Sequence, residues 1–417
     1  MPWFRAHATT SITQIYRSNI RVLEVCWLYA CRYQQVERKC LLAPTHVYIV
    51  GAGFSLHAGL PLQTEFTKAL LASPQKAAHD IKPLTAYLGN FVHDVFDHNK
   101  TAMAKFWPEL EDVFTNIDLA ANTGHHLGRH HAPSELRMTR RVLLSRMMSM
   151  LNERFTAAEA TGGPLWAKLD KFFTKLDVSR SAFISMNWDT VIERRLSALR
   201  GVNDFDYKCD AIRASFPVKG KRIVELRPLL GSQTIPVVKM HGSVNWLYCD
   251  NCRQLYWFPA AGALNVAKQL ITQTEAKKLG LVPARDFAKW NCRECVDVPL
   301  TTRIATFSYL KALDFPMFER SWLSAEELLR HAKRWIFIGY SLPAADYEFK
   351  HLLKRVQLSR EAPPEFVVVT GGKKNNTDNT YRNYQGFFGR DIRRKNNGDQ
   401  NFFARGLTAQ ALAAIRE

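Results

Sequence analysis

The sequence predicts an α/β fold with a doubly wound parallel sheet, a helical insertion and a small zinc-binding module. Five apolar runs, each as long as a strand and rich in β-branched or aromatic residues, carry this prediction. Helical patterns separate most of the runs, and each run ends at a residue suited to ligand contact, as strands of open parallel sheets do. With 417 residues, 47% of them hydrophobic, the chain can bury a large core. The five runs are residues 46–50, 182–186, 236–240, 335–338 and 366–370.

The first run stops at Gly51 and leads into a glycine turn, after which we expect a helix from about Leu62. Residues 72–175 have a helical pattern and form the expected insertion. Prolines and a Gly-Gly-Pro stretch interrupt this pattern, so we expect several helices there. The interruptions fall at Pro83, Pro108, Pro133 and residues 162–164. Residues 1–45, rich in arginine, are either an N-terminal helical arm or the result of a start codon placed too early.

The remaining elements complete a domain that spans residues 46–372. A helix is expected after the second run, over residues 190–198, and another over residues 343–357. Residues 246–299 are too irregular for a core element, and we expect a metal-stabilised excursion there. The last segment, residues 373–417, is basic and polar, and we expect a tail with little regular structure beyond a weak helix near its end.

The formal net charge of +19 favours anionic partners, which include DNA, RNA, acidic membranes and the pyrophosphate of a dinucleotide. The basic residues are scattered along the chain, and this favours a solvated surface over a dedicated nucleic-acid interface. If nucleic acid binds, the basic segment after Lys373 is the best candidate. No apolar run is long enough to cross a membrane, so we expect no membrane partner.

Eight cysteines are present, and four of them form two CxxC pairs, Cys249 with Cys252 and Cys292 with Cys295. Four thiolates are the ligand set that tetrahedral structural zinc takes, and such a site has no open position for catalysis. The sequence shows no secretory signal, which favours a reducing compartment and metal ligation over disulfides. We therefore expect a cytoplasmic protein with one structural Zn²⁺ ion.

The turn from Gly51 to Ser55 reads Gly-Ala-Gly-Phe-Ser. Its glycines let backbone amides approach a phosphate group, and the start of the following helix favours negative charge. The dinucleotide fingerprint is incomplete because Leu56 replaces its third glycine, which disfavours a conventional Rossmann dehydrogenase. A tight strand-to-helix turn without a ligand stays open as an alternative.

Polar side chains also follow the second and third runs. Asn187 and Asp189 could orient ribose hydroxyls or a water molecule, although either could instead cap the helix that begins near Thr190. His241 follows the third run and is suited to act as a general base, with a structural role as the alternative.

Together these motifs resemble the sirtuin-like domain over roughly residues 45–372. The shared pattern is a Gly-Ala-Gly turn followed by Ala-Gly-Leu-Pro, an Asn-x-Asp at a strand end, a His-Gly and the cysteine pairs. The stretches His-Gly-Ser-Val-Asn-Trp from His241 and Gly-Tyr-Ser-Leu-Pro from Gly339 are most similar to the bacterial branch that includes NAD-consuming anti-phage effectors. The resemblance implies a Rossmann-like, NAD-binding domain.

The resemblance also implies roles for individual residues. Asn187, Asp189 and His241 would hold the nicotinamide ribose and carry the catalysis. The residues implied to bind the pyrophosphate and the rest of the cofactor are Gly51, Ala52, Gly53, Ser55, Gly59, Gly339 and Ser341.

One departure from deacylating sirtuins bears on the reaction. Those proteins continue the Ala-Gly-x-Pro stretch with Asp-Phe-Arg, whereas Leu62, Gln63 and Thr64 follow Pro61 here. The implied activity is hydrolysis of NAD to nicotinamide and ADP-ribose, with water as the nucleophile, in a conditionally activated bacterial defence effector. Family analogy adds a homo-oligomer or a trigger partner such as a DNA-translocating ATPase.

Three alternatives to the hydrolase stay open. The first is a non-catalytic module that senses NAD or ADP-ribose within a complex. The second is an NAD-dependent protein deacylase or ADP-ribosyltransferase. The third is a nucleic-acid-binding protein with a vestigial fold.

Overall fold

The structure is a computed structural model, and its described residues all lie in one compact unit that starts at Pro44. The described ranges are 44–72, 81–97, 107–217, 219–227, 234–259, 262–287, 289–305, 316–371, 374–389 and 402–416. The predicted N-terminal segment, residues 1–45, falls outside these ranges except for its last two residues.

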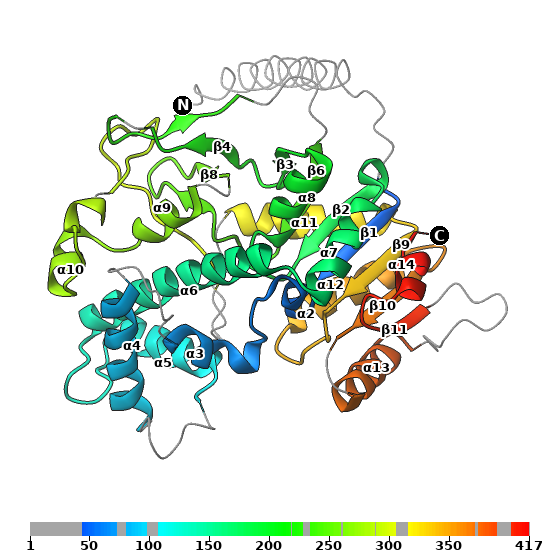
Figure 1. Cartoon of the computed structure of the whole chain (residues 1–417), viewed down its shortest axis with the longest axis horizontal. Coiled ribbons are helices and arrows are strands. Elements are labelled where there is room, and N and C mark those ends of the chain that lie inside the picture. Colours follow the sequence, from blue (N-terminus) through cyan, green and yellow to red (C-terminus); the bar gives the residue numbers. More distant parts are fainter. Residues whose placement is uncertain are drawn as a thin grey trace, which may run out of the picture. The chain divides into compact units, whose positions relative to one another are not determined.

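A parallel sheet forms the centre of the unit (Figure 1). Within the described ranges it has seven strands in the order β11-β10-β9-β1-β2-β6-β3, and every neighbouring pair is parallel. The predicted doubly wound α/β fold is therefore confirmed. The strands are β1 (His46–Val50), β2 (Ser181–Ser185), β3 (Asp204–Asp206), β6 (Thr234–Lys239), β9 (Arg334–Ile338), β10 (Glu365–Thr370) and β11 (Phe402–Arg405).

The order of the strands reverses beside β1. From β1 the chain builds outward through β2 and β6 on one side, and then returns to place β9, β10 and β11 on the other side. In doubly wound sheets, ligands bind outside the carboxyl ends of the strands at this point of reversal. The switch point of this sheet lies between β1 and β9, where Gly51 and Gly339 directly follow the two strands.

Both faces of the sheet are covered. Val47 and Ile49 pack in one apolar cluster, whereas Tyr48 and Val50 pack in another, because alternate residues of a strand point to opposite faces. Burial on both faces explains why the strands read as continuous apolar runs. Helices α7 (Pro164–Thr174), α8 (Val191–Arg200) and α14 (Ala409–Ala414) cover one face, and α11 (Pro316–His331), α12 (Tyr347–Ser359) and α13 (Lys374–Phe388) the other.

Short helical turns follow β1 before the first long helix. They are α2 (Ala52–Ser55) and a 3₁₀ turn (Leu56–Ala58), and α3 (Gln63–Leu71) then begins one residue after the predicted start. The insertion continues with α4 (Ile81–Phe96), α5 (Leu110–Thr123) and α6 (Pro133–Thr161). Pro83 does not interrupt α4, because it lies in the first turn, where backbone N–H groups have no intrahelical acceptor.

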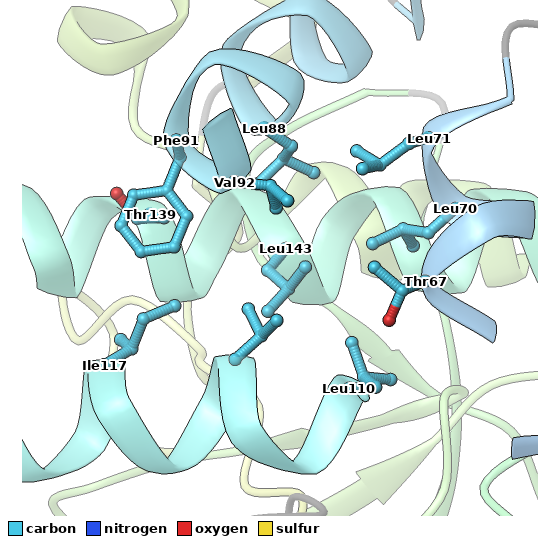
Figure 2. A pocket seen from close by; sticks show the side chains of 11 residues that line it. Thr67, Leu70, Leu71, Leu88, Phe91, Val92, Leu110, Ile117, Thr139 and Leu143 are labelled. Atoms are coloured by element: carbon cyan, nitrogen blue, oxygen red, sulfur yellow. The ribbon is translucent and has the colours of Figure 1, made fainter. Parts of the chain in front are cut away.

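The insertion has an apolar interior of its own (Figure 2). Side chains from α3, α4, α5 and α6 point toward one another around a small hollow with an empty volume of about 260 Å³. Leucines, valines and one phenylalanine line most of it, together with Thr67 and Thr139. None of the predicted site residues lies there, so this hollow is a packing feature of the insertion.

The segment between the cysteine pairs is more regular than expected. β7 (Trp246–Tyr248) and β8 (Leu255–Trp257) join β4 (Ile212–Ser215) and β5 (Val224–Glu225) in a second sheet, ordered β5-β4-β8-β7. Helices α9 (Ala263–Lys268) and α10 (Gln273–Lys278) and a 3₁₀ turn (Ala284–Phe287) follow. The prediction of irregular structure over residues 246–299 was wrong because β7 and β8 have only three residues each, too few to produce a recognisable pattern.

The polar tail was also predicted wrongly, apart from the weak helix near its end, which α14 confirms. Residues after 373 form α13, the edge strand β11 and α14, and β11 pairs in parallel with β10. A few apolar residues in this polar segment are buried, among them Tyr384, Phe388, Phe402 and Leu412, and they attach it to the sheet. None of the helices in the described ranges combines the length and hydrophobicity needed to cross a membrane.

Candidate functional site

Two glycine turns interlock at the switch point of the sheet. The amide of Gly51 donates to the carbonyl oxygen of Ile338 at 3.2 Å, and the amide of Gly53 donates to that of Gly339 at 2.9 Å. Gly339 has a φ of +64°, and a Cβ atom there would lie 2.1 Å from the backbone nitrogen of Phe54. We call these contacts between residues 51–54 and 338–340 the glycine lock. Only glycine fits at this crossing.

The glycine lock changes the role expected for two predicted cofactor residues. The amides of Gly51 and Gly53 are already hydrogen-bonded to the neighbouring turn, so the two turns hold each other and do not present these two amides to a ligand. Ala52 lies between them, at the first position of α2.

Ser55, Asn187 and Asp189 are brought together, although 132 or more residues separate Ser55 from the other two. The Ser55 hydroxyl donates to Asp189 Oδ2 at 2.7 Å and accepts from Asn187 Nδ2 at 2.9 Å. Because the side-chain nitrogen Nδ2 of Asn187 is held by Ser55, the side-chain oxygen Oδ1 is the atom that can accept a hydrogen bond from a ligand. Ser55 therefore joins the site as a connecting residue, with its hydroxyl already engaged on both sides.

Asp189 bonds to the start of α8, as the capping alternative predicted, and it also holds Ser55. Its Oδ1 atom accepts from the backbone amide of Val191 at 3.0 Å, in the first turn of α8, while Oδ2 accepts from Ser55. The residue at the N-cap is Thr190, whose side chain makes no capping bond. With 9% of its surface exposed, Asp189 fixes the start of α8 and the position of Ser55 together.

His241 lies at the carboxyl end of β6, next to the end of β2. Its Nδ1 atom is 3.3 Å from the carbonyl oxygen of Met186, the residue before Asn187. A carbonyl oxygen only accepts hydrogen bonds, so this contact favours the tautomer with the proton on Nδ1 and leaves Nε2 as the basic nitrogen. The backbone carbonyl oxygen of His241 accepts a hydrogen bond from the amide of Ala305. The carbonyl oxygen of Ala305 in turn accepts one from the indole nitrogen of Trp188.

Gly59 and Ser341 are the two remaining predicted cofactor residues. Gly59 ends the 3₁₀ turn with a φ of +77°, and a Cβ atom there would lie 2.9 Å from Cβ of Ala158 in α6. Close packing against α6 thus explains this glycine. Ser341 follows the glycine lock on the β9 side, and its carbonyl oxygen accepts from Asn383 of α13 at 3.2 Å.

A hollow adjoins Asp189 between α6 and α8. It has an empty volume of about 340 Å³ and a mostly apolar lining that includes Leu60, Leu151 and Val244. Arg194 also lines it, with its guanidinium 3.8 Å from the ring centre of Phe155. The helical insertion therefore forms one wall beside the predicted site.

The four cysteines of the predicted metal site meet at one point. Their Sγ atoms all lie within 4.8 Å of one another, and Cys252 Sγ is 3.7 Å from Cys292 Sγ. Four thiolates around a tetrahedral zinc ion at about 2.3 Å would lie about 3.8 Å apart, so the set fits this metal. Asn251 Nδ2 donates to Cys295 Sγ at 3.2 Å, and the Tyr256 hydroxyl lies 3.3 Å from Cys292 Sγ. The predicted grouping of Cys249, Cys252, Cys292 and Cys295 is confirmed.

Sequence reasoning missed a buried polar network behind the Asn187–Asp189 turn. Lys239, fully buried at the end of β6, forms an ion pair of 3.0 Å with Glu193 Oε1 of α8. Tyr207 also donates to Glu193 Oε1, and burial, followed by the Glu193 charge, raises the pKa of Tyr207 well above its usual value. The available signal was a lysine within the otherwise apolar run 236–240.

Comparison with known proteins gives only distant similarities to solved structures. No protein-family profile and no curated protein matches the chain. Solved structures similar to it are sirtuins. One describes the structural basis of sirtuin substrate affinity, with 13% identity over 90% of this chain and 93% of that chain and a TM-score of 0.32. Another is Sir2 with a p53 peptide and NAD⁺, with 15% identity, coverages of 90% and 92% and a TM-score of 0.28. Similarity at this level leaves the activity to be argued from this chain's own residues.

Proposed function

We propose that this protein is an NAD glycohydrolase that releases nicotinamide and ADP-ribose. The observation that carries the proposal is the hydrogen-bonded set of Ser55, Asn187 and Asp189, with His241 on the adjoining strand end, at the carboxyl edge of the sheet. This set lies beside the switch point, where doubly wound folds bind dinucleotides. The resemblance of the same residues to the sirtuin-like site supports NAD as the ligand.

In the proposed complex the pyrophosphate crosses the sheet edge beside the glycine lock, near the start of α2, where the end of a helix favours negative charge. The loop that carries Ser341 borders the far side of the dinucleotide. The nicotinamide ribose then lies near Asn187, whose Oδ1 atom accepts a hydrogen bond from a ribose hydroxyl or from the attacking water.

The reaction breaks the bond between ribose C1′ and the nicotinamide nitrogen. The bonding electron pair goes to the pyridinium nitrogen, which becomes neutral, and C1′ gains oxocarbenium character. Water adds to C1′, and its proton passes to Nε2 of His241 and then to solvent. Fixed dipoles aimed at the developing charge supply much of the rate enhancement in such sites.

Water is proposed as the nucleophile because of the residues after Pro61. Leu62 and Thr64, at the start of α3, stand in place of the acidic and basic residues of the deacylating motif. An enzyme that hydrolyses NAD without control would deplete its own cell. We therefore propose a conditionally activated defence effector, whose trigger is an oligomer or a partner such as a DNA-translocating ATPase.

The test is nicotinamide release from NAD by the purified full chain and by Asn187→Ala and His241→Ala, with and without DNA. Each variant should lose about 100-fold or more of kcat, typical for the loss of a group that acts in the transition state, while its unfolding curve stays unchanged. The matched control is Asn203→Ala, which removes an exposed side-chain amide that bonds to Ser197 and Gly201 at the end of α8. Full activity in both site variants would refute the assignment.

Other outcomes separate the alternatives. NAD binding without release, in the presence of DNA and at high protein concentration, would favour a sensing module. Release that requires an acylated peptide would favour a deacylase, and label transferred from NAD to protein would favour an ADP-ribosyltransferase.

A further inference from the structure

A fully buried charge lies directly behind the candidate site. Lys239 has no exposed surface, and its ammonium group donates to the backbone carbonyl oxygen of Asp189 at 2.5 Å. The same nitrogen forms the ion pair with Glu193, which is 5% exposed. Lys239 thus ties the carbonyl between Asp189 and Thr190 to the first turn of α8.

The position of this carbonyl matters because it belongs to the Asn187–Asp189 turn, whose backbone is also held by hydrogen bonds with Ser185 and Ser243. The Asn187 amide nitrogen and the Asp189 carboxylate meet at Ser55, so a rotation of the turn would separate all three side chains. On the other side of the turn, the carbonyl oxygen of Trp188 accepts from Val244 at 2.9 Å. The Lys239 bond fixes the end of the turn that carries the carboxylate.

The network continues toward the second sheet. The Tyr207 hydroxyl donates to Glu193 Oε1 at 3.1 Å, and Asn245 Nδ2 lies 3.3 Å from that hydroxyl and 2.9 Å from the carbonyl oxygen of Phe258. Phe258 directly follows β8, whose Tyr256 contacts the cysteine cluster. A continuous chain of hydrogen bonds therefore runs from the Asp189 carbonyl to the cysteine-bearing sheet.

Stability alone does not account for a buried ion pair at this place. Removing two charges from water costs several kcal/mol per ion as an order of magnitude, and well-packed apolar residues often serve the fold equally well. What apolar residues could not supply is a donor for the Asp189 carbonyl. We propose that Lys239, held by Glu193, is a positioning residue that sets the Asn187–Asp189 turn for its ligand; this inference rests on the function proposed for the same site.

The experiment separates positioning from stability with two variants. Lys239→Met leaves the Glu193 carboxylate uncompensated and should both destabilise the protein and lower its activity. Lys239→Met combined with Glu193→Gln removes both charges and keeps an acceptor for Tyr207, so its unfolding midpoint should return close to that of the wild type. The matched control is Arg146→Met with Glu153→Gln, which removes a buried arginine and its partner within α6.

Two readouts decide the result. In the Lys239/Glu193 double variant, kcat for nicotinamide release should stay about tenfold or more below that of the wild type, because one buried hydrogen bond is lost. The KM for NAD should change less than about threefold. Hydrogen exchange at the amides of residues 186–191 should be faster in this variant and unchanged in the control. A double variant that recovers stability, kcat and normal exchange would overturn the positioning role.

The exchange measurement keeps the two proposals distinguishable. If the wild type neither binds nor cleaves NAD, the proposed function fails, but faster exchange confined to residues 186–191 would still establish that Lys239 positions the turn. If hydrogen exchange at residues 186–191 is unchanged in the double variant but kcat is lower, the effect of Lys239 comes from its charge and not from positioning. This result would overturn the inference.

Discussion

Replacing Gly339 by alanine tests the geometry of the glycine lock. A Cβ atom at this position would lie 2.1 Å from the backbone nitrogen of Phe54 and 2.3 Å from the carbonyl carbon of Gly53. Ordinary carbon contacts are about 3.5–4.0 Å, so the overlap exceeds about 1 Å. The obstructing atoms belong to backbone, which cannot turn aside as a flexible side chain does, and the two turns must separate.

The chain offers a control with the same backbone angle. Gly201, which ends α8, also has a φ of +64°, and a Cβ atom there would meet nothing within 4 Å. Gly201→Ala should therefore cost only the strain of a left-handed residue, about 1–2 kcal/mol of unfolding free energy. Gly339→Ala adds overpacking of at least about 1–3 kcal/mol, for a total of about 2–5 kcal/mol. The difference between the variants isolates the crossing.

Urea denaturation of the wild type and both variants measures these losses, with equal m-values as the condition for comparing midpoints. NAD binding by Gly339→Ala, measured under conditions in which the variant is folded, should fall more than binding by Gly201→Ala. If both variants lose the same free energy and bind NAD equally well, the turns are not locked and the switch point is not the ligand crevice.

Two further predictions concern the metal and pH. Purified protein should contain about one zinc ion per chain, measured by atomic emission. The Cys252→Ser variant should lose this zinc ion and have a lower unfolding midpoint. Wild-type protein that contains no metal and whose stability does not change with a chelator would contradict the zinc site. Burial lowers the pKa of His46 from 6.5 to about 4, so between these values the unfolded chain binds a proton that the folded chain does not. This contribution to stability is complete above pH 6.5 and is lost as pH falls toward 4. His46→Gln should therefore show a smaller drop in urea midpoint than wild type between about pH 7 and about pH 5, and equal drops would refute the argument.

Much of the sheet was predictable because parallel strands buried on both faces leave a strong pattern. The run 46–50 coincides with β1, and the runs near β2, β6, β9 and β10 differ from those strands by one or two residues. The clustering of Ser55, Asn187 and Asp189 was predictable for a related reason, since the carboxyl ends of parallel strands meet at one edge. Motif order and topology thus indicated this cluster of side chains before any distance was known.

The features that the sequence did not predict have a common physical cause, because each of them depends on tertiary contacts. β11 is a four-residue edge strand whose place is set by pairing with β10, and nothing in its own sequence specifies that partner. Local sequence likewise could not show that the amides of Gly51 and Gly53 would be occupied by the turn after β9. Lys239 was overlooked because a lysine is rarely fully buried without a partner, and its partner Glu193 lies on a different element.

The glycine lock and the Lys239 pair hold the site from two sides. The lock joins the turn before Ser55 to β9, and Lys239 joins the turn of Asn187 and Asp189 to α8. The three site side chains bond one another only while both turns stay in place, so the supports act on one shared geometry. Residues that share a network are energetically coupled. The alignment of the candidate site thus depends on backbone far outside the motifs, and a trigger that shifts either support would control the proposed NAD cleavage without touching the reacting atoms.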